Sequence, residues 1–320
     1  MGNKLESVFG EVLVAIERDE LSFPVFPECA NRVRTLINDP DVSAQQVVAA
    51  ISGDIGISAH LIKAANSAVF ADKPKVEHLR QAVSRLGYKQ VHNLVLLVTL
   101  SELLHTQHPV ISRYLRDFWC RNREVAAFSF VLAQSNRQIN PEQAMLAGLL
   151  HNIGALPICL YVDRPGFELD IEELYELIDR LQVQVAAKLL AVWRFPDAVI
   201  AAVTGGAAAD GPVHYADLVK LASLLSQPLV KDIDWGNVKA AQRLGMDEHA
   251  CRSFALDHQV QLTQARALLG IESANPAPPA PPVAAQPIPQ VIRPVRAPVR
   301  VEPVSKPGFF AAILRFFGLG

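Results

Sequence analysis

The stretch Ala82-Val-Ser-Arg-Leu-Gly-Tyr-Lys-Gln-Val-His-Asn-Leu-Val-Leu-Leu-Val-Thr-Leu100 decides the fold class of this chain. Its glycine, Gly87, separates two amphipathic runs, Val76 to Leu86 and Tyr88 to His105. Glycine is common at the C-terminal end of a helix because it adopts the left-handed backbone conformation without strain. The stretch therefore predicts two successive helices that meet at Gly87.

The same helical period extends in both directions from this pair. Apolar positions from Leu5 to Ile16 line one face of a helix, and Ser43 followed by Gln46 is a capping-box pattern. Asp54 or Ser58 is expected to cap the next helix. Strand signals, which are alternating β-branched residues bounded by tight turns, are almost absent. The sequence predicts an all-α domain, with further helices over Glu28–Ile37, Tyr114–Gln134, Pro141–Leu150, Ile171–Trp193, Pro196–Val203, Tyr215–Ser226 and Asp247–Leu269.

Composition and charge limit the classes of protein to consider. With 320 residues, 50% of them hydrophobic, the chain can bury a substantial core in one or two domains. A net charge of -2 provides no basic field that would attract nucleic acid. Neither a zinc knuckle nor a disulfide framework is expected, and a reducing compartment fits best, because no CxxC pair occurs among Cys29, Cys120, Cys159 and Cys251.

Two patterns argue against export and membrane insertion. Glu6, Glu11 and Glu17 interrupt the apolar residues of the N-terminal region, whereas a secretory signal needs an uninterrupted apolar stretch. The apolar run Leu94 to Leu100 is far shorter than the roughly 20 residues of a membrane span. We expect a soluble, cytoplasmic protein.

The composition changes sharply after Ser273. Of the 22 prolines, 11 lie between Pro276 and Pro307. Because proline lacks a backbone donor and fixes φ, this stretch is expected to be a disordered, extended linker. From residue 274 onward there are five basic residues and one acidic residue, so this tail has a net charge of +4 and the remainder has -6. A tail of this charge is suited to contact the acidic remainder, an acidic partner or an anionic lipid surface.

The last 13 residues, 308–320, contain four of the 14 phenylalanines. An aromatic cluster at the end of a linker that cannot bury it is typical of a docking element. We predict a short amphipathic helix that docks in cis or in trans, ahead of the alternatives of a further core element and of weak membrane-surface contact. Its candidate docking residues are Phe309, Phe310, Ile313, Leu314, Phe316 and Phe317.

Several motifs, in this order along the chain, resemble the HDOD (HD-related output) domain family. They are Pro24-Val-Phe-Pro27, Asn38-Asp-Pro40, Ser52-Gly-Asp54 leading into Ile57–Ala68, Ala82–Gly87 followed by Val91–Val95, Ala144–Leu156 and Val183–Pro196. The resemblance covers roughly residues 20 to 230 and implies a multi-helix domain related to the HD superfamily. Within these motifs, Asn66, Ser67, Gly87 and Trp193 are expected to have structural roles.

The resemblance also allows the metal chemistry of the HD superfamily to be tested residue by residue. Catalytic HD hydrolases hold divalent metals with imidazoles and carboxylates from several helices. Here Asn152 follows His151 where the family pattern has aspartate, and a neutral amide cannot balance the charge of a metal. We predict no bound metal, no cofactor and no enzymatic activity, and His151 becomes a hydrogen-bonded core histidine. The other altered ligand positions are Arg121, Gln182, Gly205 and Gly206, with Ser223 nearest to the last acidic ligand.

Other candidates for chemistry have simpler structural explanations. His105 and His108 are spaced to clip a metal, but no acidic or sulfur partner is nearby and a solvated helix end is expected. The pair Asn66-Ser67 falls at a helix end, where both side chains can satisfy backbone groups. The two helices around Gly87 superficially resemble a helix-turn-helix, but the second is too apolar to present polar groups to DNA bases.

These expectations combine into one organisation and one leading function. We expect a non-catalytic regulatory scaffold that acts through a protein partner in trans. The resemblance implies bacterial signal transduction, with a partner such as a receiver or cyclic-di-GMP signalling protein, and no direct binding of nucleic acid is expected. The alternatives are a residual metal-dependent phosphohydrolase or nucleotide-binding protein with a relocated site, and a peripheral membrane adaptor anchored by the tail. The expected parts are an N-terminal helix over 1–20, an HDOD-like helical domain over 21–230, a helical extension over 231–273, a Pro-rich linker over 274–307 and the Phe-rich segment 308–320.

Overall fold

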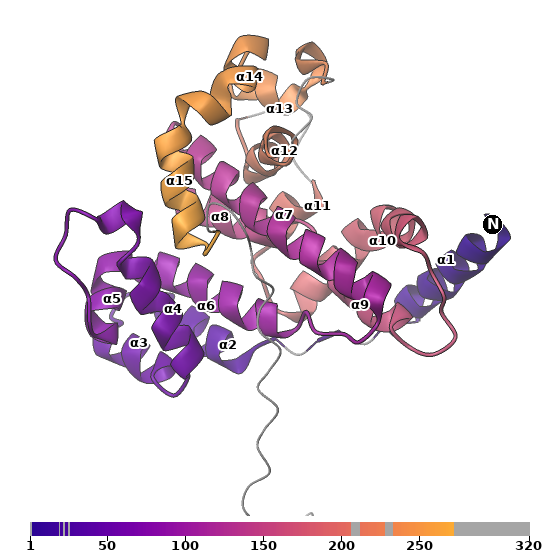
Figure 1. The fold of residues 1–320 in the computed structure, drawn as a ribbon, viewed down its shortest axis with the longest axis horizontal. Coiled ribbons are helices and arrows are strands. Elements are labelled where there is room, and N and C mark those ends of the chain that lie inside the picture. The colour runs from indigo at the N-terminus through magenta and orange to yellow at the C-terminus, as the bar shows by residue number, and fades with distance from the viewer. Residues whose placement is uncertain are drawn as a thin grey trace, which may run out of the picture. The chain divides into compact units, whose positions relative to one another are not determined.

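A computed structural model describes residues 2–18, 20–21, 23–24, 26–205, 212–227 and 233–271, all of which belong to one compact unit. The Pro-rich linker, the Phe-rich segment with its six docking candidates, and Gly206 lie outside the described residues. In the part of the chain that is described, α-helices and short 3₁₀ turns form the fold and no β-strand occurs (Figure 1). The prediction of an all-α domain is confirmed.

The helices alternate with short connections along the whole unit. In chain order they are α1 (Gly2–Glu17), α2 (Glu28–Ile37), α3 (Ala44–Ile51), α4 (Ile55–Ala65), α5 (Leu79–Leu86), α6 (Tyr88–Glu102), α7 (Pro109–Gln134), α8 (Pro141–Leu150), α9 (Ala155–Val162), α10 (Ile171–Val192), α11 (Asp197–Thr204), α12 (Tyr215–Leu225), α13 (Lys239–Arg243), α14 (Glu248–Asp257) and α15 (Gln259–Leu268), with 3₁₀ turns η1 (Ala68–Phe70) and η3 (Trp235–Asn237).

Local sequence signals account for most helix ends. The capping box of Ser43 and Gln46 opens α3, and Asp54 caps α4 by accepting a hydrogen bond from the Ile57 amide. Gly87, with φ of 78°, ends α5 and directly precedes α6, as the opening stretch of sequence predicts.

The prediction of one helix over Asp247–Leu269 is wrong, because α14 and α15 are separated at His258. The His258 backbone adopts φ of -110° and ψ of 26°, and its ring stacks on Phe254 at 4.3 Å. The bend lets Phe254 on α14 and Leu262 on α15 both enter the core. Continuous apolar periodicity conceals such a break.

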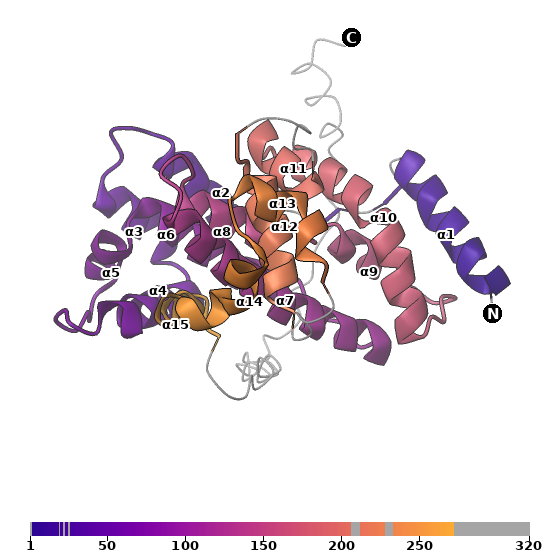
Figure 2. The same cartoon turned by 90° about the horizontal axis from the view of Figure 1, so that it is seen from above.

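The longest helix, α7, organises the packing. Helices α8, α10, α12 and α15 contact it, while α2, α3, α4, α5 and α6 pack among themselves, and α1 lies along α10 (Figures 1 and 2). Side chains from the expected N-terminal helix, HDOD-like domain and C-terminal extension share one hydrophobic core, which contains Val12, Leu149 and Phe254. The extension is therefore part of the same packed unit.

One stretch of the described chain, Pro141–Val162, is long and apolar enough to cross a membrane by length and composition. It comprises α8, a turn and α9, and 83% of its apolar window is buried inside the fold. This stretch is core structure.

Candidate functional site

The corner between α8 and α9, residues 148–154, is where four of the positions that correspond to HD metal ligands lie. We call it the His151 corner. Two glycines allow its backbone to be approached closely. A Cβ atom on Gly148 would lie 2.8 Å from the Cα of Ala126 on α7, and one on Gly154 would lie 1.9 Å from the Gln182 carbonyl oxygen on α10. Because no side chain fits at either position, α7 and α10 pack directly against this corner.

His151 itself is buried, with 8% of its surface exposed. Its Nδ1 lies 2.8 Å from the Gly148 carbonyl oxygen, and because a carbonyl only accepts, Nδ1 carries the proton. Its Nε2 is buried without a hydrogen-bond partner. Burial, together with the nearby positive charge of Arg121, lowers the pKa of His151 to about 4. The imidazole is therefore uncharged at neutral pH.

The structure gathers four of the predicted positions at this corner. Arg121 extends from α7, is exposed, and acts electrostatically on His151. Asn152 is half-buried in the turn, where its carbonyl oxygen accepts a hydrogen bond from the Ala155 amide. Gln182 contributes its backbone beside Gly154, and its Oε1 atom is buried without a partner.

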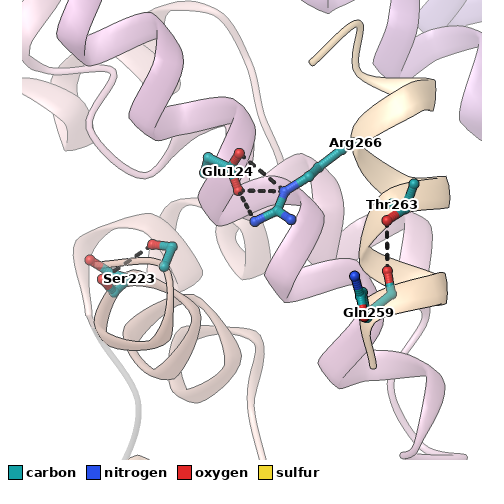
Figure 3. A network of polar contacts seen from close by, with 6 residues as sticks. Glu124, Ser223, Gln259, Thr263 and Arg266 are labelled. Atoms are coloured by element: carbon teal, nitrogen blue, oxygen red, sulfur yellow. Dashed lines mark hydrogen bonds and ion pairs between the residues drawn. The ribbon is translucent and has the colours of Figure 1, made fainter. Parts of the chain in front are cut away.

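Two further predicted positions lie on other elements. Gly205 ends α11 in the left-handed conformation, with φ of 75°. Ser223 lies on α12, where its carbonyl oxygen accepts a hydrogen bond from the Ser226 hydroxyl at 3.4 Å (Figure 3). These contacts are local to each helix.

The donor set at the His151 corner does not fit a divalent metal. It consists of one neutral imidazole, two amide side chains and a guanidinium, whereas such metals need several anionic or imidazole ligands. Within the described ranges, no group of three or more His, Cys, Asp and Glu side chains is placed to hold a metal ion. We derive no metal-dependent step for this site.

Asn122 also lies at this corner, although the sequence motifs do not include it. It is 1% exposed, and its side-chain amide donates a hydrogen bond to the Leu149 carbonyl oxygen at 3.0 Å. This bond satisfies a backbone acceptor near the end of α8, which has no partner within its own helix. Its position on the mostly apolar buried face of α7, which also carries the polar Ser129, is the signal that points to it.

A second corner, residues 192–196 between α10 and α11, joins two of the resembling motifs, and we call it the Arg194 corner. The Trp193 indole donates a hydrogen bond to the Pro24 carbonyl oxygen at 2.9 Å. The ring of Phe26 lies 5.1 Å from that of Trp193 and 5.7 Å from that of Phe195. The Arg34 guanidinium lies over the rings of Phe26 and Phe195, at 4.5 and 4.9 Å. These contacts hold the segment before α2 against the end of α10.

The remaining candidates have structural contacts. The Asn66 side chain at the end of α4 donates to the Val76 carbonyl oxygen at 2.7 Å and accepts from the Val76 amide at 2.8 Å. His105 is exposed, and its Nδ1 bonds the Glu102 carbonyl oxygen at 2.9 Å. Cys159 and Cys251 are buried, whereas Cys29 and Cys120 are half-buried.

Helix α15 is fastened to α7 by charged side chains. Arg266 forms a two-pronged contact with Glu124, with N–O distances of 2.9 to 3.1 Å (Figure 3). Arg123 donates a hydrogen bond to the Gly270 carbonyl oxygen at 3.1 Å. The last described residues are thus held against the centre of the fold.

The all-α fold, in which the ordered motifs form the His151 and Arg194 corners, is that of a domain related to the HD superfamily. The family model for the HDOD domain matches residues 23–206, and the chain belongs to the HDOD family. A protein from Shewanella amazonensis SB2B, provisionally named a metal-dependent phosphohydrolase, has a similar structure, with a TM-score of 0.69 and 25% identity over 84% of this chain and 99% of that one.

Two other proteins place this similarity in context. A protein from Marinobacter aquaeolei VT8, provisionally named a signal transduction protein, gives a TM-score of 0.56 and 25% identity, covering 84% of this chain and 66% of that one. An uncharacterized protein from Treponema pallidum (strain Nichols) is 28% identical over 136 residues, which is 41% of this chain and 25% of that protein. The chain thus spans only a quarter of this relative's length.

Proposed function

We propose that this HDOD protein is a non-catalytic regulator of bacterial signal transduction that acts in the cytoplasm by binding a protein partner. The observation that carries the proposal is the His151 corner, where an uncharged, buried imidazole is accompanied by amides and a guanidinium instead of metal ligands. HDOD membership and the similarity to a protein provisionally named for signal transduction fit a regulatory role.

Charge at the His151 corner supports the non-catalytic part of the proposal. A divalent metal would have to approach the cationic guanidinium of Arg121, which repels it. It would find only the Nε2 lone pair of His151 as a strong ligand. Replacing Arg121 by a neutral residue would still leave too few metal ligands, because Asn152 and Gln182 offer only weakly binding carbonyl oxygens.

The first test measures metal and hydrolysis in the full chain. We expect protein purified without chelators to contain far less than one equivalent of Mn, Fe or Zn by mass spectrometry, and to leave bis(p-nitrophenyl) phosphate intact with added Mn²⁺. His151→Ala should change neither result. Stoichiometric metal that disappears in His151→Ala would reject the proposal and favour a phosphohydrolase, the activity suggested by the name of the Shewanella protein.

The partner is proposed to be a protein in trans, such as a receiver or cyclic-di-GMP signalling protein, and the Phe-rich segment 308–320 is proposed to assist its docking. The test compares the full chain with the double variant Phe309→Asp/Phe316→Asp. Val301→Asp/Val304→Asp, which adds the same charge to the Pro-rich linker, is the matched control. We expect a receiver-domain partner to be retained less well by the first variant than by the control. Equal retention would exclude the Phe-rich segment from docking.

A further inference from the structure

The backbone of Arg194 is unusual among the described residues. Its φ is 56°, and among the described residues no other non-glycine residue has a positive φ. The same left-handed conformation follows α11, α13 and α15, where the residues are Gly205, Gly245 and Gly270, with φ of 75°, 68° and 67°. A side chain is strained in this conformation and glycine is not. Strained backbone of this kind is often found at functional sites, where the side chain has a role of its own.

The hydrogen bonds of this helix end do not need an arginine. The Arg194 amide bonds the Ala191 carbonyl oxygen and the Phe195 amide bonds the Leu190 carbonyl oxygen, both at 2.9 Å. This is the usual arrangement of a helix that ends in glycine, and it uses backbone atoms only. Glycine would make the same bonds with less strain. The Arg194 guanidinium therefore has no role in ending α10.

A second guanidinium, that of Arg34, lies 4.9 Å from the ring centre of Phe195, the residue that follows Arg194. Its burial, and after that the charge of Arg194, lowers the pKa of Arg34. The described residues supply neither arginine with a carboxylate partner. Arg34 donates through Nη2 to the Asn31 side-chain oxygen at 2.8 Å, while its Nη1 is buried with no acceptor. The guanidinium lies over the rings of Phe26 and Phe195, at 4.5 and 4.9 Å from their centres. Within the described part of the chain, these two like charges thus have no carboxylate to neutralise them, and an anion that joined them would offset their repulsion.

The buried imidazole of His92 is a third nitrogen-bearing group at the Arg194 corner. His92 on α6 is 4% exposed, and its Nε2 has no hydrogen-bond partner. The Arg34 charge acts on this imidazole, and burial is the larger cause that lowers the pKa of His92 to about 4. Among the described residues, the charges that act on Arg34 and on His92 are those of arginine and lower both pKa values.

We propose that Arg34 and Arg194 together bind an oxyanion, the phosphate or carboxylate group of a ligand, at the Arg194 corner. Guanidinium groups suit this task because their planar N–H donors match the oxygens of both groups. The neighbouring side chain of Val192, 60% exposed, offers an apolar contact for the rest of the ligand. This site goes beyond the proposed function, because it depends neither on the Phe-rich segment nor on the His151 corner.

The test titrates the full chain with inorganic phosphate and, separately, with succinate, at constant ionic strength. Binding is followed by NMR through the Trp193 indole and the arginine side-chain N–H signals. We expect at least one anion to shift these signals, and both Arg34→Gln and Arg194→Gly to weaken its affinity about tenfold or more. Arg137→Gly, which removes the same charge from an exposed turn, is the matched control and should leave the affinity unchanged.

Thermal stability separates this binding role from a structural one. Arg194→Gly relieves the backbone strain, so we expect its Tm to rise by about 2–4 °C while anion affinity falls. Phosphate binding alone identifies a phosphorylated ligand, and succinate binding alone identifies a carboxylate. If neither anion binds, if both variants bind as tightly as the wild type, or if Arg194→Gly lowers Tm, the proposal is overturned.

Discussion

The His151 corner and the Arg194 corner lie next to the same helix, α10, and use glycine and arginine in opposite ways. At the His151 corner, Gly148 and Gly154 remove the side chains, so that neighbouring backbones meet and a polar group is enclosed. At the Arg194 corner, an arginine occupies a conformation in which glycine would be relaxed. The His151 corner is therefore built for packing, whereas the Arg194 corner holds a charged side chain despite backbone strain.

The electrostatic consequences follow from this difference. The enclosed imidazole of His151 stays neutral because burial penalises its charged form. At the Arg194 corner, the polar groups are the guanidiniums of Arg34 and Arg194, which are cationic donors without any acceptor atom. Ligand chemistry in this HDOD protein is therefore to be sought at the Arg194 corner, although the family pattern points to the His151 corner.

The largest expected effect breaks the packed corner. In Gly154→Ala, the added Cβ would lie 1.9 Å from the Gln182 carbonyl oxygen and 2.7 Å from the Ala186 nitrogen, both backbone atoms that cannot rotate away. We expect the free energy of unfolding in urea to fall by more than about 3 kcal/mol. Gly10→Ala is the control, because a Cβ there meets nothing within 4 Å and should stabilise α1 by about 0.5–1 kcal/mol. Similar small effects of both variants would contradict the close approach of α10.

The next effect introduces a charge into the same corner by lowering the pH. The pKa of His151 is about 4 in the folded protein, against the ordinary histidine value of 6.5 in the unfolded chain. Between these pH values the unfolded chain binds more protons, so the free energy of unfolding falls as the pH decreases from 6.5 to 4, by about 3 kcal/mol for this group.

Urea unfolding at several pH values between 4.5 and 7 checks this sign. His151→Gln should flatten the dependence, although His92, with a pKa also of about 4, will maintain part of it. His105→Gln alters an exposed histidine and should leave the slope as in the wild type. Parallel curves for the wild type and His151→Gln would show that His151 is not buried uncharged.

The two corners also differ in how far the sequence reveals them. Helical periodicity and capping residues predict the all-α class, the bounds Glu28–Ile37 and Pro141–Leu150, and the helix end at Gly87. The HDOD motifs predict which residues replace metal ligands, and the structure brings Arg121, His151, Asn152 and Gln182 to one corner. The motifs predict these positions because each one, in its order along the chain, resembles a helix or turn of the family.

The Arg194 corner was hidden in the sequence for a physical reason. Its cations come from residues 160 positions apart, Arg34 and Arg194, and neither stands in a charged cluster along the chain. The left-handed conformation of Arg194 is equally hidden, because glycine is the residue that marks such helix ends. The break at His258 is hidden in the same way, because apolar residues continue across it and Phe254 and Leu262 on its two sides are both buried.

A smaller effect loosens the support behind the Arg194 corner. Trp193→Phe removes the hydrogen bond from the indole to the Pro24 carbonyl oxygen and leaves most of the ring packing with Phe26. We expect a loss of about 1–2 kcal/mol in the free energy of unfolding, together with weaker phosphate binding. Trp119→Phe, which alters a half-buried indole on α7, should leave phosphate binding unchanged. Unaltered phosphate affinity in Trp193→Phe would separate the anion site from this support.

The smallest effect uses a contact that belongs to neither corner. Glu124→Gln removes the charge that pairs with Arg266, but these side chains are 28% and 36% exposed, so solvent screens much of their attraction. We expect a loss of about 0.5–1 kcal/mol that shrinks in high salt, and faster amide hydrogen exchange confined to α15. Glu28→Gln, which alters the more exposed pair with Arg32, should have a still smaller effect. If Glu124→Gln also changed the pH dependence assigned to His151 or the affinity for phosphate, the two corners would be coupled through α7 and their contrast would need a shared cause.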